Sequence, residues 1–142
     1  GHRVFISATG VRLPLGTPEM RYHYNIEDIM IYYHNPRCSK SREGLKILEE
    51  SHLDITIKLY LTEKISFSEI NEIVKKLKIK PIDLVRKMEP VIKDNEIMLL
   101  NMSDTEIIQL MVKHPVLIER PILVKDDKAV IGRPPELIRS IL

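Results

Sequence analysis

The feature that most constrains the fold is a pair of strand patterns separated by one helix pattern. Residues 31–33 form a short buried-strand pattern that ends at His34, and residues 54–61 alternate apolar and polar side chains with period two. Residues 39–50, between them, carry apolar side chains at helical spacing. A strand, a helix and a second strand in this order predict a right-handed crossover between parallel strands.

The rest of the body adds helices and a hairpin. Capping-box patterns at Ser66 and Ser103 predict the starts of two helices. Two short apolar runs within residues 122–131 flank a tight turn and predict an antiparallel hairpin, and a closing helix follows from residue 134. Together these elements predict an α/β fold class: a thioredoxin-like mixed sheet flanked by helices, with an inserted helical region at about 66–114.

Length and composition limit the class of protein. The chain has 142 residues, one cysteine and a formal net charge of +2, which predicts a single domain over residues 30–142 without a disulfide framework or a Cys-rich zinc site. The mixed charges argue against a nucleic-acid or membrane-surface partner, and no apolar run is long enough to span a membrane. We therefore expect a cytoplasmic globular protein with no metal site.

The first 29 residues differ from the rest. Residues 1–29 hold three of the five glycines and have no helical period, although residues 3–7 and 11–15 could pair as a hairpin. The Gly1-His2 start and the later Met30 suggest a leader derived from cloning or from a mis-started reading frame. The alternative is a native arm that docks on a neighbouring subunit and so makes a homodimer.

The single cysteine falls where a thiolate is favoured. Cys38 lies at the predicted mouth of the helix over residues 39–50, where backbone N–H groups and the helix dipole stabilise negative charge. Lowering a thiol pKa by two units needs roughly 2.7 kcal/mol, and a helix terminus supplies roughly 0.3–2 kcal/mol. Further cations or donors are therefore required, and the flanking residues offer them: Arg37, Ser39, Lys40, Ser41 and Arg42. The alternative is an inert, buried cysteine.

Four motifs together resemble one family. They are the loop over residues 34–42 (His-Asn-Pro-Arg-Cys-Ser-Lys-Ser-Arg), Arg86 in Leu-Val-Arg-Lys, Arg120 in Leu-Ile-Glu-Arg-Pro-Ile, and Arg133 in Ile-Gly-Arg-Pro-Pro-Glu. In this order the chain from about residue 30 to residue 142 resembles the glutaredoxin-coupled arsenate reductases.

The resemblance implies a role for each residue. Cys38 matches the nucleophile that attacks arsenate, and the Arg120–Pro121 peptide bond is expected to be cis. The residues that support the thiolate would be His34, Ser41 and Arg42. The residues that bind the oxyanion would be Arg86, Arg120 and Arg133, whose planar guanidinium groups offer fixed charge and paired hydrogen bonds.

Cysteine count bears on the source of electrons. A Cys-x-x-Cys pair would need a second cysteine at position 41, which is Ser41, so the chain cannot close an internal disulfide and two electrons must come from outside thiols. This disfavours thioredoxin-coupled arsenate reductases and redox-switching regulators. The resemblance implies glutathione as co-substrate, glutaredoxin as partner and no bound cofactor.

The sequence leaves more than one function open. A tyrosine-phosphatase-like hydrolase would need an arginine six residues after the cysteine, whereas Arg42 follows Cys38 by four, which disfavours that chemistry. Two further functions fit the same residues. One is a paralogue that acts on a different thiol or oxyanion substrate, and the second is a non-enzymatic partner-binding protein on the same fold.

Overall fold

The computed structural model describes residues 30–142, which form two compact units. The described part of the first unit combines residues 30–59 with residues 120–142, and the second unit comprises residues 60–119. The predictions made for residues 1–29, a leader with a hairpin and an arm that could join a second copy, lie outside the described residues.

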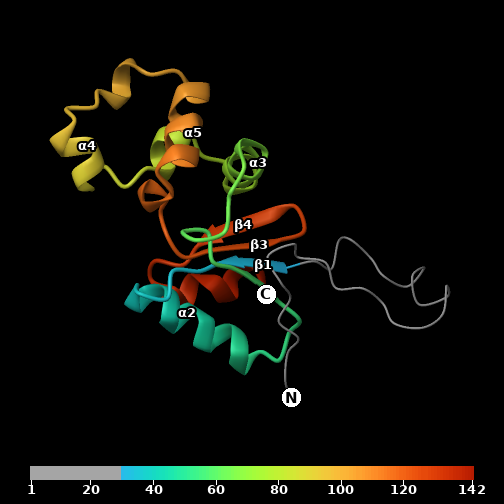
Figure 1. Ribbon diagram of the computed structural model, residues 1–142. Helices are drawn as coiled ribbons and strands as arrows, with labels where there is room; N and C mark the ends of the chain where they lie inside the picture. Colours follow the sequence, from blue (N-terminus) through green and yellow to red (C-terminus); the bar gives the residue numbers. More distant parts are fainter. Residues whose placement is uncertain (1–29) are drawn as a thin grey trace. The chain divides into compact units, whose positions relative to one another are not determined.

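A four-stranded mixed sheet forms the centre of the first unit, in the order β2-β1-β3-β4 (Figure 1). Its strands are β1 (Met30–Tyr33), β2 (Thr56–Lys58), β3 (Ile122–Lys125) and β4 (Lys128–Ile131). Strand β1 pairs in parallel with β2 and antiparallel with β3, and β3 and β4 form the predicted hairpin. These directions confirm the predicted α/β class with a mixed sheet.

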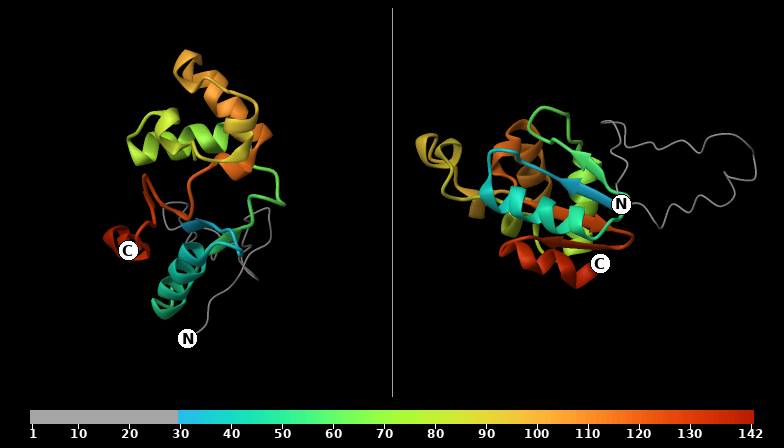
Figure 2. Two further views of the ribbon diagram at one scale, coloured as in Figure 1. Left: turned by 90° about the vertical axis from the view of Figure 1, so that its left-hand side faces the viewer. Right: turned by 90° about the horizontal axis from the view of Figure 1, so that it is seen from below.

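Two helical elements lie side by side against one face of this sheet (Figure 2). They are α2 (Ser39–Glu50), with the bounds predicted from the sequence, and η5 (Pro135–Ile141), a 3-10 helix where the closing helix was predicted. The core between them and the sheet contains Tyr32, Leu48, Leu123 and Ile138. Because this core draws on both ends of the described chain, burial of its apolar surface holds the two segments of the unit together.

The second strand is shorter than the alternating pattern over residues 54–61 predicts. Strand β2 keeps three residues because its partner β1 ends at Tyr33, and a final backbone hydrogen bond runs from the His34 N–H to the Lys58 carbonyl at 2.9 Å. The pattern places Leu61 on the buried side, but its side chain is 40% exposed. The pattern is therefore right about the existence of the strand and wrong about its end.

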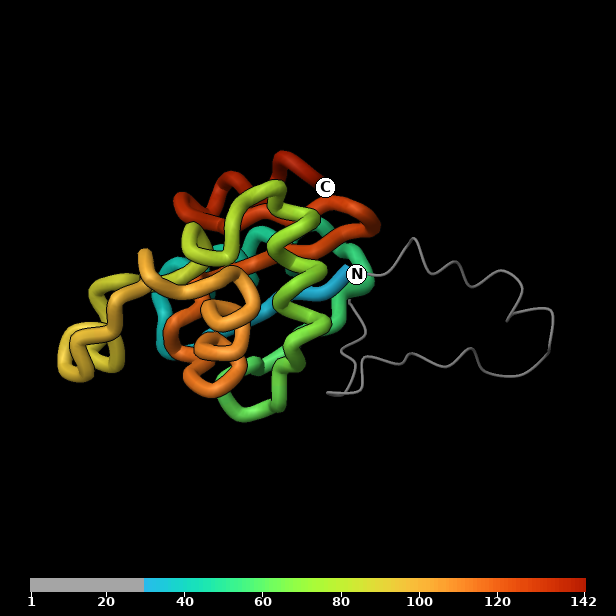
Figure 3. The backbone as a smooth tube through the Cα atoms, turned by 90° about the horizontal axis from the view of Figure 1, so that it is seen from above, coloured from blue at the N-terminus to red at the C-terminus, as the bar shows by residue number. Residues whose placement is uncertain are grey.

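The second unit is helical and contains the insertion predicted at about 66–114. Its elements are α3 (Phe67–Leu77), η2 (Pro81–Leu84), α4 (Pro90–Asp94), η3 (Leu99–Asn101), α5 (Asp104–Lys113) and η4 (Pro115–Leu117). Ser66 and Ser103 begin α3 and α5 with both hydrogen bonds of a capping box, as predicted. Figure 3 shows α3 and α5 beside each other, with α4 on the other side of α5.

Candidate active site

Cys38 is the N-cap residue of α2 and follows the turn that leaves β1. Its N–H donates to the Asn35 carbonyl at 3.0 Å, and its own carbonyl accepts from the Arg42 N–H at 3.0 Å. The side chain is half-buried. The sulfur therefore lies at the positive end of the helix dipole, beside N–H groups that have no partner within the helix.

Behind the sulfur, Ser41 organises a buried network. Its Oγ lies 2.7 Å from His34 Nδ1 in a hydrogen bond and accepts a second one from the Asn35 N–H at 2.9 Å. Ser41, His34 and Asn35 are all buried. Burial first, and then the positive charge of Arg42, lower the pKa of His34 below its ordinary value, which favours a neutral imidazole in this network.

Two residues of this network, Tyr32 and Asn35, are not predicted as site residues by the sequence patterns. Tyr32 donates from its hydroxyl to the Ser41 carbonyl at 2.6 Å, and Asn35 accepts from the Arg37 N–H at 3.0 Å through its side chain. For Asn35 a signal existed, because asparagine commonly bonds to the backbone two residues later in turns. For Tyr32 there was none, since a tyrosine in an apolar strand is read as core.

The first unit also brings two of the three predicted oxyanion arginines to the cysteine. Arg133 Nη1 lies 3.9 Å from Cys38 Sγ and donates to the Arg120 carbonyl at 3.1 Å. The Arg120 side chain is half-buried and hydrogen-bonds to Cys38. The Arg120–Pro121 peptide bond is cis, as expected, and the Arg133–Pro134 peptide bond is cis as well.

The pKa of the Cys38 thiol is lowered from its ordinary value by the balance of these contacts. Partial burial raises it, but hydrogen bonds from the Ser41 backbone, the Arg120 side chain and the Lys40 backbone, together with the charge of Arg120, outweigh burial. Cys38 therefore has a larger fraction of thiolate, the nucleophilic form of cysteine, than a cysteine without these contacts.

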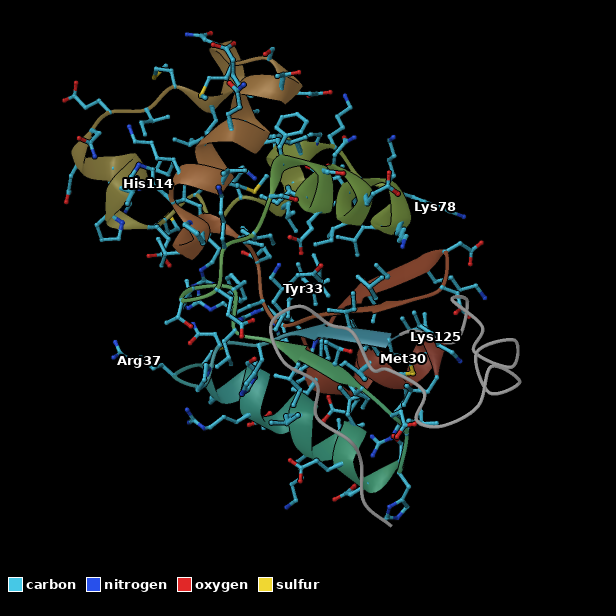
Figure 4. The ribbon with its side chains drawn as sticks, turned by 45° about the vertical axis from the view of Figure 1, so that its right-hand side comes forward. Met30, Tyr33, Arg37, Lys78, His114 and Lys125 are labelled. Atoms are coloured by element: carbon cyan, nitrogen blue, oxygen red, sulfur yellow. The ribbon has the colours of Figure 1, made fainter. Side chains whose placement is uncertain are left out.

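The structure gives the side chains that flank Cys38 separate contacts. The Arg42 guanidinium donates to the Pro36 carbonyl at 2.9 Å and so braces the turn. The exposed Arg37 side chain points away from the sheet (Figure 4). Ser41 supports the sulfur through its backbone, because its hydroxyl is occupied by His34 and Asn35.

Arg86, the third predicted oxyanion ligand, belongs to the second unit. Its Nε donates to Glu89 Oε1 at 2.9 Å, and its Nη1 lies 3.8 Å from Glu119 Oε1. A short antiparallel bridge between Val85 and Ile118 fixes this arrangement, with the Arg86 N–H donating to the Leu117 carbonyl at 2.7 Å. Within its own unit, Arg86 is thus held by two carboxylates.

Metal-binding clusters and membrane-spanning helices are both missing from residues 30–142. These residues contain no group of three or more His, Cys, Asp or Glu side chains placed to hold a metal ion. Over the same stretch no helix has the length and apolar character needed to cross a bilayer.

The chain is similar to several curated proteins. An arsenate reductase of Haemophilus influenzae is 42% identical over 114 residues, which cover 80% of this chain and 98% of that protein. An uncharacterized protein of Escherichia coli K12, YfgD, is 40% identical over 111 residues, covering 78% of this chain and 93% of its own length.

Solved structures and a family model agree with these relatives. An arsenate reductase structure from Vibrio cholerae superposes with a TM-score of 0.75 at 36% identity, covering 81% of this chain and 98% of the other. Such neighbours confirm the predicted thioredoxin-like fold. The model of the ArsC family matches residues 33–141, a span that includes the cysteine turn and all three arginines. On the family match and on relatives that align along almost their whole length, the chain belongs to the ArsC family.

Proposed function

We propose that this chain reduces arsenate to arsenite, with Cys38 as nucleophile and with glutathione and glutaredoxin supplying the electrons. The observation that carries the proposal is a cysteine whose pKa is lowered at a helix N-terminus, with two guanidinium groups beside it. Relatives named arsenate reductase, among them the Haemophilus influenzae protein at 42% identity, support arsenate as the substrate.

The first step is attack of the Cys38 thiolate on arsenate. A sulfur–arsenic bond forms and a protonated oxygen leaves as water, so arsenic stays in its pentavalent state. Arsenate carries negative charge near neutral pH, and the attacking sulfur is an anion. Arg120 and Arg133 reduce the repulsion between them, since both are fixed cations at the sulfur.

Reduction follows in steps that need thiols from outside the chain. Glutathione forms a second sulfur–arsenic bond and a second water leaves. The glutaredoxin thiolate then attacks the glutathione sulfur, forming a disulfide, and the electron pair of the broken bond reduces arsenic to the trivalent state. Water displaces Cys38, which returns as a thiolate, and arsenite leaves. Because the chain has one cysteine, both electrons come from these two partners.

We further propose a role for Arg86 in binding the oxyanion, as the family resemblance implies. Glu89 and Glu119 hold its guanidinium within its unit, which keeps the charge oriented at a residue that is only partly exposed. We assign the reaction to the cytoplasm, where glutathione is kept reduced.

The test is arsenate-dependent oxidation of NADPH in the presence of glutathione, glutaredoxin and glutathione reductase. Wild type should turn over, Cys38→Ser should not, and Lys46→Ala, at an exposed position later on α2, should resemble wild type. Leaving out glutaredoxin should abolish turnover. Replacing glutathione and glutaredoxin with thioredoxin and thioredoxin reductase should not restore it.

The competing functions predict different outcomes. Activity with thioredoxin alone would overturn the glutaredoxin coupling but not arsenate reduction. No activity in a folded wild-type protein would overturn arsenate reduction and favour a paralogue with another thiol or oxyanion substrate, or a partner-binding protein. Hydrolysis of a phosphate monoester is not expected, since Arg42 is engaged with the Pro36 carbonyl.

A further inference from the structure

Ser41 is fixed at three points of its own backbone and side chain. Its backbone helps to lower the pKa of Cys38, its Oγ bonds to His34 and Asn35, and its carbonyl accepts from the Tyr32 hydroxyl. Three of these partners lie in the turn around the cysteine. Tyr32 differs from them because it lies inside β1 and reaches α2 across the core.

The bond from Tyr32 is not needed to satisfy the Ser41 carbonyl. Ser41 lies in the first turn of α2, so its carbonyl already accepts from the backbone N–H four residues later. A second donor at 2.6 Å, from a fully buried ring, therefore adds a constraint on where this peptide lies.

The packing around the hydroxyl is close enough to make the constraint rigid. The Tyr32 ring stacks on the His34 ring with centroids 5.6 Å apart. On the other side, a Cβ added at Gly44 would collide with the Tyr32 hydroxyl and with Ile138 Cδ1. Helix α2 can approach β1 this closely because residue 44 has no side chain.

We propose that Tyr32 is a positioning residue for the nucleophile: by holding the Ser41 carbonyl, its hydroxyl fixes the first turn of α2, at whose N-cap position Cys38 lies. The inference deepens the proposed function, on which it rests for the role of Cys38. Burial raises the pKa of Tyr32, and the nearby Cys38 charge raises it further, so the hydroxyl stays protonated as a donor and lies within electrostatic reach of the sulfur.

Charged and titratable groups from several elements of the unit lie in or beside the cysteine turn, and the test must leave them unchanged. His34 follows β1 and Arg42 lies on α2, while Arg120 precedes β3 and Arg133 lies between β4 and η5. Replacing Tyr32 with phenylalanine removes one oxygen and none of these charges. A change in the thiol titration would then report the position of the Ser41 peptide.

The experiment compares Tyr32→Phe with Tyr33→Phe. Tyr33 is the next residue of β1, is also buried, and faces the opposite side of the sheet. The readouts are the ultraviolet titration of the Cys38 thiolate and the rate of its alkylation by iodoacetamide. Neither requires arsenate, so the result stands whether or not the protein reduces it.

In Tyr32→Phe we expect the thiol titration to move to higher pH and alkylation at neutral pH to slow by roughly threefold. Tyr33→Phe should titrate like wild type. Equal titrations in wild type and Tyr32→Phe, with both folded, would overturn the inference while leaving the proposed function intact.

A second variant covers the case in which Tyr32→Phe does not fold. Gly44→Ala places a methyl group where the Tyr32 hydroxyl lies and should push it off the Ser41 carbonyl, again slowing alkylation. Where both single variants fold, their effects should not add in the double variant Tyr32→Phe/Gly44→Ala, since both act on one hydrogen bond. Alkylation of Gly44→Ala at the wild-type rate would count against the inference.

Discussion

Arg133 Nη1 donates to the Arg120 carbonyl at 3.1 Å while lying 3.9 Å from Cys38 Sγ. One guanidinium is thus oriented by the backbone of the residue that carries the other. Arg120 in turn lowers the pKa of Cys38 through its side chain. Both arginines thus place positive charge near the sulfur, which favours an anion there, either the thiolate or an oxyanion.

Replacing Arg120 should weaken the thiolate more than replacing Arg133. Arg120→Gln removes both a hydrogen bond and a charge that lower the pKa of Cys38, so the thiol should titrate at higher pH. We expect alkylation at neutral pH to slow about threefold to tenfold. Arg120→Lys, which keeps the charge but not the fork of donors, should fall between Arg120→Gln and wild type. The pH dependence of iodoacetamide alkylation measures this, and a wild-type profile for Arg120→Gln would contradict it.

Ser41→Ala should destabilise the first unit. The change leaves the Asn35 N–H and His34 Nδ1 buried without their partner, which costs about 1–3 kcal/mol in the free energy of unfolding. Urea unfolding measures the loss. Ser39→Ala, at an exposed position of the same helix turn, is the matched control and should change stability little. Equal losses in the two variants would contradict a specific contribution of the network.

His34 should make stability depend on pH below its ordinary pKa. Because the folded-state pKa of His34 is lowered, the folded and unfolded chains are both neutral there above about pH 6.5. Below that pH the unfolded chain binds a proton that the folded chain does not. The free energy of unfolding should therefore fall as pH falls, by at most about 1.4 kcal/mol per pH unit from this group.

Urea unfolding at several pH values between neutral and mildly acidic checks the slope. His34→Asn should flatten it, whereas His52→Asn, at an exposed residue with φ of 56°, should leave it as in wild type. A wild-type slope in His34→Asn would assign the pH dependence to other groups.

Removing Arg86 should separate its two roles. Arg86→Met breaks contacts with Glu89 and Glu119, and since the three side chains are 24%, 19% and 26% exposed, we expect a loss of about 1 kcal/mol in the free energy of unfolding. If Arg86 also binds the oxyanion, the KM for arsenate should rise. Lys87→Met, an exposed neighbour, is the control for both measurements. A stability loss with an unchanged KM would leave Arg86 a structural residue.

Removing the N-cap side chain of α3 should destabilise the protein by as much as removing a typical helix N-cap does. Ser66→Ala removes the acceptor of the Glu69 N–H and should reduce the free energy of unfolding by about 0.5–2 kcal/mol. Ser68→Ala, two residues later and exposed, should be close to neutral. Thermal or urea unfolding distinguishes the two, and equal effects would argue against a role for the cap.

The parts of the fold that local sequence determines were predicted well. The bounds of α2 and the caps at Ser66 and Ser103 depend on residues within a few positions of one another. The local sequence pattern therefore includes the residues that determine them. The end of β2 depends on where its partner β1 stops, and no pattern within residues 54–61 carries that information.

The candidate site divides in the same way. A reactive cysteine at the start of a helix could be inferred from neighbouring residues, whereas the hydrogen bond from Tyr32 to Ser41 requires a strand and a helix to pack at one distance. The partners of Arg86 were equally hidden, because Glu119 meets it through an isolated bridge between segments 33 residues apart. Long-range pairing of this kind is set by the whole core.

Cys38 and Arg133 are separated by 95 positions along the chain. A ribosome therefore completes the turn that bears the sulfur long before it makes the guanidinium groups that lie beside it. Until then the nascent thiol lacks the contribution of Arg120 to its lowered pKa and has only those of the Ser41 and Lys40 backbone, so its reactivity should be lower than in the folded chain. The full nucleophilicity of Cys38 is therefore acquired only after the segment that carries β3 and β4 has paired with β1.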